Sequence, residues 1–200
     1  GDGSSVGISS GNTSHYISLQ QGNIFRRNSN LQPGFINARL TPANLSPSRL
    51  FVTLFHLDPD YSTTLYYADH NKLYRNGRAD TVTLDAQAAN RMQEVTGVAS
   101  AIGNEGLRSF ATNRGVYNAA TSVLFFGTNA GKVFRLSDPR NCPAGTLPVQ
   151  INAGAGMPNG TITGLAVNPR NADTLLAVYS NYGVTSIWFC GNALGETPTW

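Results

Sequence analysis

A pattern that recurs about every 50 residues is the feature that most restricts how this chain can fold. Each copy has an apolar or alternating run, a polar turn, a second and more apolar run, and a short turn that leads to an aromatic residue. The aromatic residues are Phe25, Tyr74, Phe134 and Trp188. The four copies run from Ser4 to Arg27, Phe51 to Asn76, Leu107 to Leu136 and Ile162 to Cys190.

The apolar runs predict β-strands, because they are short, rich in aromatic and β-branched residues, and bounded by turn formers. Leu65-Tyr66-Tyr67 and Val123-Leu124-Phe125-Phe126 are examples. The turn between the second and third run is short enough for a hairpin. A weaker run follows each aromatic residue and predicts a fourth strand at Phe35 to Leu40, Gln93 to Thr96, Val149 to Ile151 and Pro198 to Trp200.

Four antiparallel strands repeated at this period are typical of a β-propeller blade. We therefore expect an all-β chain of four four-stranded antiparallel sheets, forming a partial β-propeller over residues 1–200. We interpret Asp80 to Arg91 as an irregular insertion. The expected blades span residues 1–45, 46–97, 98–152 and 153–200, and we expect them to belong to a larger propeller in a longer chain with further domains.

Composition excludes several other classes. Charged residues make up 12% of the chain, with 21 Gly and 10 Pro, which argues against a coiled coil, a helical bundle and disorder driven by charge. The net charge of +3 comes without a basic cluster, so we expect no nucleic-acid partner. No apolar run is long enough to span a membrane.

The repeats resemble those of neuraminidase-type and sortilin-type propellers. The segments that carry the resemblance read ITGLAVNPRNADTLLAV from Ile162, SVLFFGTNAGKVFRL from Ser122 and TLYYADHNKLYRN from Thr64. The opening residues, from Gly1 to Arg27, resemble a blade common in secreted proteins of this group. The Asp-box turn of that family is matched only in part, by the segment CGNALGETPTW from Cys190, which lacks the Asp. The resemblance implies a repeat fold and not an activity.

Two cysteines, Cys142 and Cys190, are too few and too far apart for a zinc site. A disulfide between them and two free thiols both stay open. Low charge and abundant Asn, Thr and Ser favour a secreted or cell-surface protein. Three sequences match the N-glycosylation motif, at Asn12, Asn44 and Asn159.

Repeated residues are expected to serve the blade, whereas unrepeated polar residues on the turns are better candidates for a site. Arg26, Arg75 and Arg135 recur after the aromatic residue, and we expect their stems to pack over it. Asp69-His70 is the leading pair, because it replaces a small Gly-Thr of another copy. The candidates for ligand binding are Asp69, His70, Asn71, Gln20, Gln21, Asn181 and Tyr182, with Asn104 and Asn129 on the same face.

The function that we expect is an interaction or scaffold module that binds a protein or a glycan through this face. A glycoside hydrolase is the alternative, which needs two carboxylates at a set separation, and its candidates are Asp2, Asp69 and Glu105. A sialidase would need clustered arginines, and only Arg108 has a suitable place. A structural spacer in a large surface protein is the third possibility. No metal cluster, nucleophile motif or phosphate loop is present, so we expect no metal and no cofactor.

Overall fold

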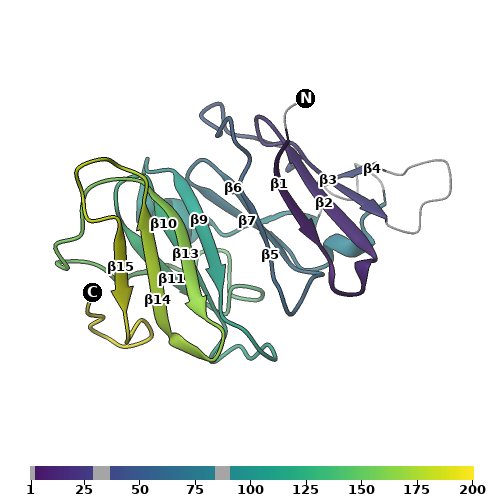
Figure 1. Ribbon diagram of the computed structural model, residues 1–200. Helices are drawn as coiled ribbons and strands as arrows, with labels where there is room; N and C mark the ends of the chain where they lie inside the picture. The colour runs from purple at the N-terminus through teal and green to yellow at the C-terminus, as the bar shows by residue number, and fades with distance from the viewer. Residues whose placement is uncertain (1–2, 29–36, 84–90) are drawn as a thin grey trace. The chain divides into compact units, whose positions relative to one another are not determined.

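The computed structural model describes residues 3–28, 37–83 and 91–200 (Figure 1). The chain divides into two compact units, Gly1–Thr96 and Gly97–Trp200. Each unit contains two antiparallel sheets, and in every sheet the strands lie side by side in sequence order. The prediction of an all-β chain with four antiparallel sheets is confirmed.

Unit 1 holds two four-stranded meanders, sheets A and B. Short apolar runs form their second strands, as the sequence predicts. Sheet A consists of β1 (Gly3–Ile8), β2 (Ser14–Leu19), β3 (Ile24–Asn28) and β4 (Asn37–Arg39), and sheet B of β5 (Phe55–Leu57), β6 (Leu65–Asp69), β7 (Lys72–Asn76) and β8 (Gln93–Glu94).

Unit 2 holds sheets C and D, which repeat the plan of unit 1 with one strand fewer in the last sheet. Sheet C consists of β9 (Leu107–Thr112), β10 (Val123–Thr128), β11 (Val133–Ser137) and β12 (Val149–Gln150), and sheet D of β13 (Ile162–Asn168), β14 (Asn171–Tyr179) and β15 (Ile187–Cys190).

The fourth strand predicted at 198–200 is wrong, because these residues form no strand. The Trp200 indole N–H instead donates a hydrogen bond of 2.8 Å to the Ile151 carbonyl, directly after β12. Thr199 N–H donates to the Asn192 side-chain oxygen at 2.8 Å. The segment is therefore held by side chains and by the end of sheet C, rather than by a strand ladder.

Helices are short in the described residues. They are α2 (Thr96–Ile102) and the 3₁₀ turns η1 (Ser10–Asn12) and η2 (Ala79–Thr81). The sequence did not predict α2, which buries Val98 and Ile102. The predicted insertion at Asp80 to Arg91 begins in η2, and its residues 84–90 lie outside the described part.

Neighbouring residues on a strand point to opposite faces of the sheet, so each sheet has two distinct faces. We call the face with the third-strand aromatic residue the aromatic face, and the opposite face the arginine face. Phe25, Tyr74, Phe134 and Trp188 each occupy the third strand and pair with the second strand, opposite Ile17, Tyr67, Phe126 and Ala177.

These four aromatic residues differ in burial. Tyr74 and Phe134 are buried, whereas Phe25 and Trp188 are half-buried. Phe25 lies on a sheet face that no described segment of unit 1 covers, and the Trp188 indole N–H bonds to the nearby Thr185 carbonyl. Their positions match, but their environments differ with the sheet that carries them.

The two sheets of each unit pack in the same way. In unit 1, Tyr16 and Ile24 from the arginine face of sheet A meet Tyr67 and Tyr74 from the aromatic face of sheet B. In unit 2, Phe125 on the arginine face of sheet C lies in one core cluster with residues on the aromatic face of sheet D. An arginine face against an aromatic face is thus the packing rule inside both units.

The repeated arginines do not lie over their aromatic neighbours, so that prediction is wrong. Strand alternation sends each arginine to the opposite face, toward the next sheet. Arg26 donates to the Val82 carbonyl at 2.9 Å, and Arg135 donates to the Ala193 carbonyl at 2.8 Å. Each of these two arginines ties one sheet to the segment that follows the third strand of the next sheet.

A second repeated contact joins the sheets of each unit at their hairpin turns. Tyr67 Oη donates to the Gly22 carbonyl at 3.0 Å, and Tyr179 Oη donates to the Gly131 carbonyl at 3.1 Å. Gly22 and Gly131 hold the same place in the turn before the third strand. Both units therefore use one tyrosine from the second strand to close on the previous hairpin.

Candidate functional site

The turn before β3 and the turn before β7 lie under one long loop, residues 40–54, which joins β4 to β5. Gln21 N–H donates to the Phe51 carbonyl at 2.9 Å, and Gly22 N–H donates to Thr53 Oγ1 at 2.8 Å. At the other turn, Ser46 N–H donates to the Asp69 carboxylate. The loop is thus fastened to both hairpins of unit 1.

The two turns need unusual backbone conformations. Gln21 and His70 both have φ of 57°, and Gly22 has φ of 84°. A Cβ added at Gly22 would come within 2.6 Å of Tyr67 Oη. Glycine is therefore required there both for its conformation and for the close approach of the tyrosine.

A solvent-open pocket of about 350 Å³ is lined by Gln21, Pro47, Arg49 and Phe51. Phe51 is 64% exposed, so its ring is available at the rim. Arg49 is half-buried and donates to the Ser46 carbonyl at 3.0 Å, which holds the guanidinium against its own loop. The pocket therefore combines a flat apolar ring, a fixed cation and an amide that both donates and accepts hydrogen bonds.

Asp69 lies below this loop with no exposed surface. Burial raises the pKa of its carboxyl group, while the Ser46 N–H and the charges of Lys72 and Arg49 act in the opposite direction. Within the described residues, Asp69 Oδ1 has no hydrogen-bond partner. Asp69 therefore holds the loop from inside, and its carboxylate is closed off from solvent.

The other candidates of unit 1 lie at or near the surface. Gln21 is exposed and lines the pocket, whereas Gln20, His70 and Asn71 are half-buried on the two turns. Asp2 lies outside the described residues. Of these candidates, Gln21 alone lines the pocket that the loop forms.

The candidates of unit 2 each have contacts of their own. Glu105 accepts a hydrogen bond from Thr128 Oγ1 at 2.9 Å and forms an ion pair with Lys132. Asn181 accepts a hydrogen bond of 2.7 Å from Thr161 N–H, and Tyr182 is fully exposed. Asn104 is exposed, and the exposed Asn129 accepts a hydrogen bond from Gly106 N–H.

Asp69 and Glu105 belong to different units and Asp2 lies outside the described residues, so neither unit contains two described hydrolase candidates. Asp69 is buried in unit 1, Glu105 is ion-paired in unit 2, and Asp2 is not described. Arg108 is half-buried, and burial lowers the pKa of its guanidinium. Its guanidinium donates to the neighbouring Leu107 carbonyl at 2.9 Å, which is a structural contact.

Both cysteines are buried and neither is in a disulfide, so the structure contains no Cys142–Cys190 bridge. Cys142 follows β11 in a turn that its N–H closes on the Asp138 carbonyl at 2.8 Å. Cys190 ends β15 inside the core of unit 2, and burial raises the pKa of its thiol. Each cysteine is thus accommodated in its own packing environment, Cys190 as a protonated core thiol.

No group of three or more His, Cys, Asp or Glu side chains suited to a metal ion occurs in the described ranges. None of the helices found there is long and apolar enough to cross a membrane.

A second hollow, of about 620 Å³, lies along the first strands of sheets A and B. It is lined mainly by apolar residues of β1 and β5, with His56 and Asp58 among them. Burial lowers the pKa of His56 to about 4, so its ring is neutral at physiological pH. The His56 ring stacks on Tyr66 with 6.4 Å between centroids, which marks it as a packing residue.

Sequence reasoning missed Pro47, Arg49 and Phe51, which form most of the pocket. Pro47 and Arg49 belong to the connection before the second copy of the repeat, and Phe51 is the first residue of that copy. The available signal was an unrepeated arginine beside an apolar pair, Leu50-Phe51, in a stretch otherwise typical of a loop. This signal can be interpreted only once the fold is known, because hydrogen bonds to Gln21 and Asp69 determine where the loop lies.

Comparison with known proteins supports the fold. No protein family matches the chain, and no curated protein sequence matches it. Three solved structures superpose on 94% of it. Two are the computationally designed proteins Ika8 and Ika4, with TM-scores of 0.52 and 0.53 and identities of 6% and 8%.

The third is the GH74 xyloglucanase from Xanthomonas campestris, a β-propeller enzyme, with a TM-score of 0.58 and 14% identity. The chain spans 45% of Ika8, 93% of Ika4 and 28% of the xyloglucanase. At these identities the likeness shows the fold alone. The four sheets are those of a propeller-like fold.

Proposed function

We propose that this chain is a non-catalytic module that binds a glycan in the pocket formed by Gln21, Arg49 and Phe51. The observation that supports it is the pocket's composition: an exposed ring beside a guanidinium and an amide. A sugar ring presents a flat C–H surface and several hydroxyl groups. The Phe51 ring can stack on the C–H surface, and the Arg49 and Gln21 side chains can form hydrogen bonds with the hydroxyl groups.

The pocket is prepared before the ligand arrives. The Phe51 carbonyl is fixed by Gln21, and the Arg49 guanidinium by Ser46. The Asp69 carboxylate holds Ser46 from below. Fixing a loop in advance lowers the entropy that binding costs, so affinity depends on these buried contacts as well as on the residues that touch the ligand.

A glycan array with the purified chain, followed by titration of the best ligand, tests this proposal. Phe51→Ala and Arg49→Ala should each weaken binding roughly tenfold, which corresponds to about 1.4 kcal/mol. Tyr182→Ala is the matched control, since this fully exposed aromatic residue lies in the other unit. Two results would refute the proposal. One is an array on which the chain binds no glycan, and the other is binding that Tyr182→Ala abolishes and Phe51→Ala leaves intact.

A glycoside hydrolase is the second candidate, and the likeness to a xyloglucanase fold is what favours it. The test is hydrolysis of xyloglucan and other polysaccharides by the full-length protein. Activity abolished by Asp2→Asn or Asp69→Asn would establish the hydrolase and displace the binding module. A protein ligand, or a spacer that binds nothing, would be indicated by an empty array.

We also propose that the protein acts outside the cell or at its surface, as the resemblance to secreted neuraminidase-type and sortilin-type repeats implies. The three glycosylation-motif asparagines, Asn12, Asn44 and Asn159, are all exposed. Fractionation of the source cells with an antibody against the chain tests this. Recovery only from the cell interior would contradict it.

A further inference from the structure

The pocket that Gln21, Pro47, Arg49 and Phe51 line contains a cation without an acidic partner. Arg49 forms no ion pair with any residue of the described ranges 3–28, 37–83 and 91–200. Its guanidinium donates to one neutral acceptor, the Ser46 carbonyl, at 3.0 Å. A half-buried charge gains most from a partner of the opposite sign, so this pocket favours a ligand that brings one.

The guanidinium has five N–H donors, which divide into those that the protein uses and those that a ligand can use. One Nη1 N–H donates to the Ser46 carbonyl. The Nε atom is buried and has no hydrogen-bond partner in the described part of the chain, so neither solvent nor a ligand reaches it. The remaining donors belong to the terminal nitrogens, Nη1 and Nη2. Two terminal N–H groups side by side fit two oxygens of one oxyanion.

The segments that build the pocket offer an anion little repulsion. Residues 17–24, around the turn before β3, carry no charged side chain, and residues 40–54, the long loop, carry Arg49 alone. The turn before β7 adds Asp69, whose side chain has no exposed surface. The charged side chains that act on the Asp69 carboxyl are all basic: Lys72, Arg49 and His70. An anionic ligand therefore meets a cation and no exposed carboxylate from these three described segments.

We propose that the glycan bound in this pocket is acidic: a sugar ring stacks on Phe51, and a carboxylate or sulfate group of the glycan accepts hydrogen bonds from the Arg49 guanidinium. This proposal rests on the function proposed above and adds the chemical class of the ligand. The Gln21 amide remains for a neutral hydroxyl group. A hydrogen bond between two charged groups is roughly twice as strong as one between neutral groups, so the anionic group decides which glycans bind.

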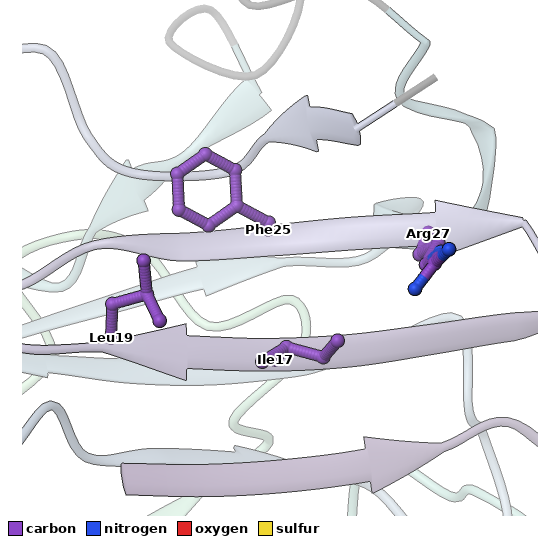
Figure 2. A pocket seen from close by; sticks show the side chains of 4 residues that line it. All are labelled: Ile17, Leu19, Phe25 and Arg27. Carbon is purple, nitrogen blue, oxygen red and sulfur yellow. The ribbon is translucent and has the colours of Figure 1, made fainter. Parts of the chain in front are cut away.

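A second hollow of unit 1 is also lined by an arginine and provides a comparison. It lies on the aromatic face of sheet A and has a volume of about 550 Å³. Figure 2 shows its lining side chains, Ile17, Leu19, Phe25 and Arg27, which come from β2 and β3. The three neighbours of Arg27 are hydrocarbon side chains, which form no hydrogen bond with a sugar hydroxyl group. Arg27 is therefore a matched control for Arg49, with the same charge in the same unit.

Matched pairs of glycans test the preference for charge. The purified chain is applied to an array of uronic-acid, sialylated and sulfated glycans. Each is printed beside a neutral counterpart, in which the carboxyl group is reduced to an alcohol or the sulfate is removed. We expect the neutral counterparts to bind about tenfold more weakly, which corresponds to about 1.4 kcal/mol. Binding to carboxylated or to sulfated members supports the proposal and identifies the anionic group.

Two failures can be told apart on this array. Equal binding to the acidic and the neutral member of each pair would overturn the acidic ligand and leave glycan binding intact. An array on which no glycan is bound would overturn both proposals.

Variants of Arg49 then test its role with the best acidic glycan and its neutral counterpart. Arg49→Gln removes the charge, so it should bind both members of the pair equally weakly. Arg49→Lys keeps the charge but loses the paired donors, and it should retain part of the preference. Arg27→Gln, and Arg170→Gln at an exposed residue of unit 2, should leave the preference unchanged, with the fold checked by circular dichroism. A preference lost in Arg27→Gln and kept in Arg49→Gln would overturn the proposal.

The ionic strength provides a readout that a purely structural role of Arg49 would not affect. The screening length falls from about 10 Å to about 3 Å between about 0.1 M and about 1 M salt. Affinity for the acidic glycan should fall over this range, whereas affinity for its neutral counterpart should stay constant. Equal salt dependence for the two glycans would contradict a charge–charge contact at Arg49.

Discussion

Asp69 shows how one buried carboxylate can organise a surface that it does not reach. The sequence pointed to Asp69 as an unrepeated polar residue, and the structure places it under the loop with its carboxylate on Ser46 N–H. Its position could be predicted from the repeat, since it ends the second strand of its sheet. Its burial could not, because the covering loop lies outside the repeat.

Asp69→Asn should flatten the dependence of stability on pH. Burial raises the pKa of this carboxyl in the folded state, so its contribution is present below the ordinary Asp pKa and is lost as pH rises through the raised value. Unfolding by urea at several pH values should therefore show that the free energy of unfolding of the variant rises relative to that of the wild type from acid toward neutral pH. If the difference in free energy of unfolding between the variant and the wild type stayed constant from acid to neutral pH, the prediction would be contradicted.

His56 should produce the opposite dependence. The pKa of His56 falls to about 4 in the folded state, whereas the pKa of a histidine in an unfolded chain is about 6.5. The unfolded chain therefore binds the proton first, and stability is lost as pH falls from about 6.5 to about 4. His56→Gln should remove this part of the acid sensitivity in the same urea titration, and a variant as acid-sensitive as the wild type would argue against a buried neutral ring.

At the scale of elements, the strands could be predicted well and their ends less well. The second strands are dense in aromatic and branched residues, so β6 and β10 stood out in the sequence. The segment 198–200 has no such run. Its course is set by the hydrogen bond that the Asn192 side-chain oxygen accepts from Thr199 N–H and by the one that the Trp200 indole donates to the Ile151 carbonyl. Helix α2 was missed because its seven residues fall between two repeats and show no clear helical periodicity.

The turn before β11 should tolerate no side chain. Gly131 has φ of 76°, and an added Cβ would lie 2.1 Å from the Pro158 carbonyl oxygen. Gly131→Ala should lower the free energy of unfolding by more than the roughly 1–3 kcal/mol typical of backbone strain alone. Gly154→Ala is the matched control, because Gly154 has φ of 73° with no neighbour within 4 Å. Equal losses at both positions, measured by chemical denaturation, would show that the close approach has no energetic weight.

At the scale of the whole molecule, the structure contains the same pair of sheets twice. Tyr67 and Tyr179 both belong to the second strand of their sheet and bond to equivalent glycine carbonyls. The four-fold repeat was readable in the sequence, whereas the pairwise plan was not. Contacts between sheets depend on side chains that lie about 45 to 50 residues apart, and one sequence gives no direct sign of them.

Tyr67→Phe should cost about 1 kcal/mol, since it removes the hydrogen bond to the buried Gly22 carbonyl. Tyr179→Phe should cost less, because the Gly131 carbonyl still accepts a hydrogen bond of 2.7 Å from the Asn152 side-chain amide. Tyr182→Phe should cost nothing measurable, because that side chain is fully exposed. Denaturation by urea, compared across the three variants, checks this. A cost at Tyr179 as large as the cost at Tyr67 would contradict this difference between the two units.

The sequential order of strands in every sheet has a consequence for synthesis. Each strand pairs only with its immediate neighbours in the sequence, so a sheet needs no residue that has yet to be made. Ribosomes synthesise a chain from its N-terminus at roughly 5–20 residues per second, whereas a hairpin forms in about 1–10 μs. Sheets A and B can therefore assemble on the ribosome while unit 2 is still being translated. A translational pause after all of unit 1 has emerged from the ribosome would leave a nascent chain whose first core is already complete.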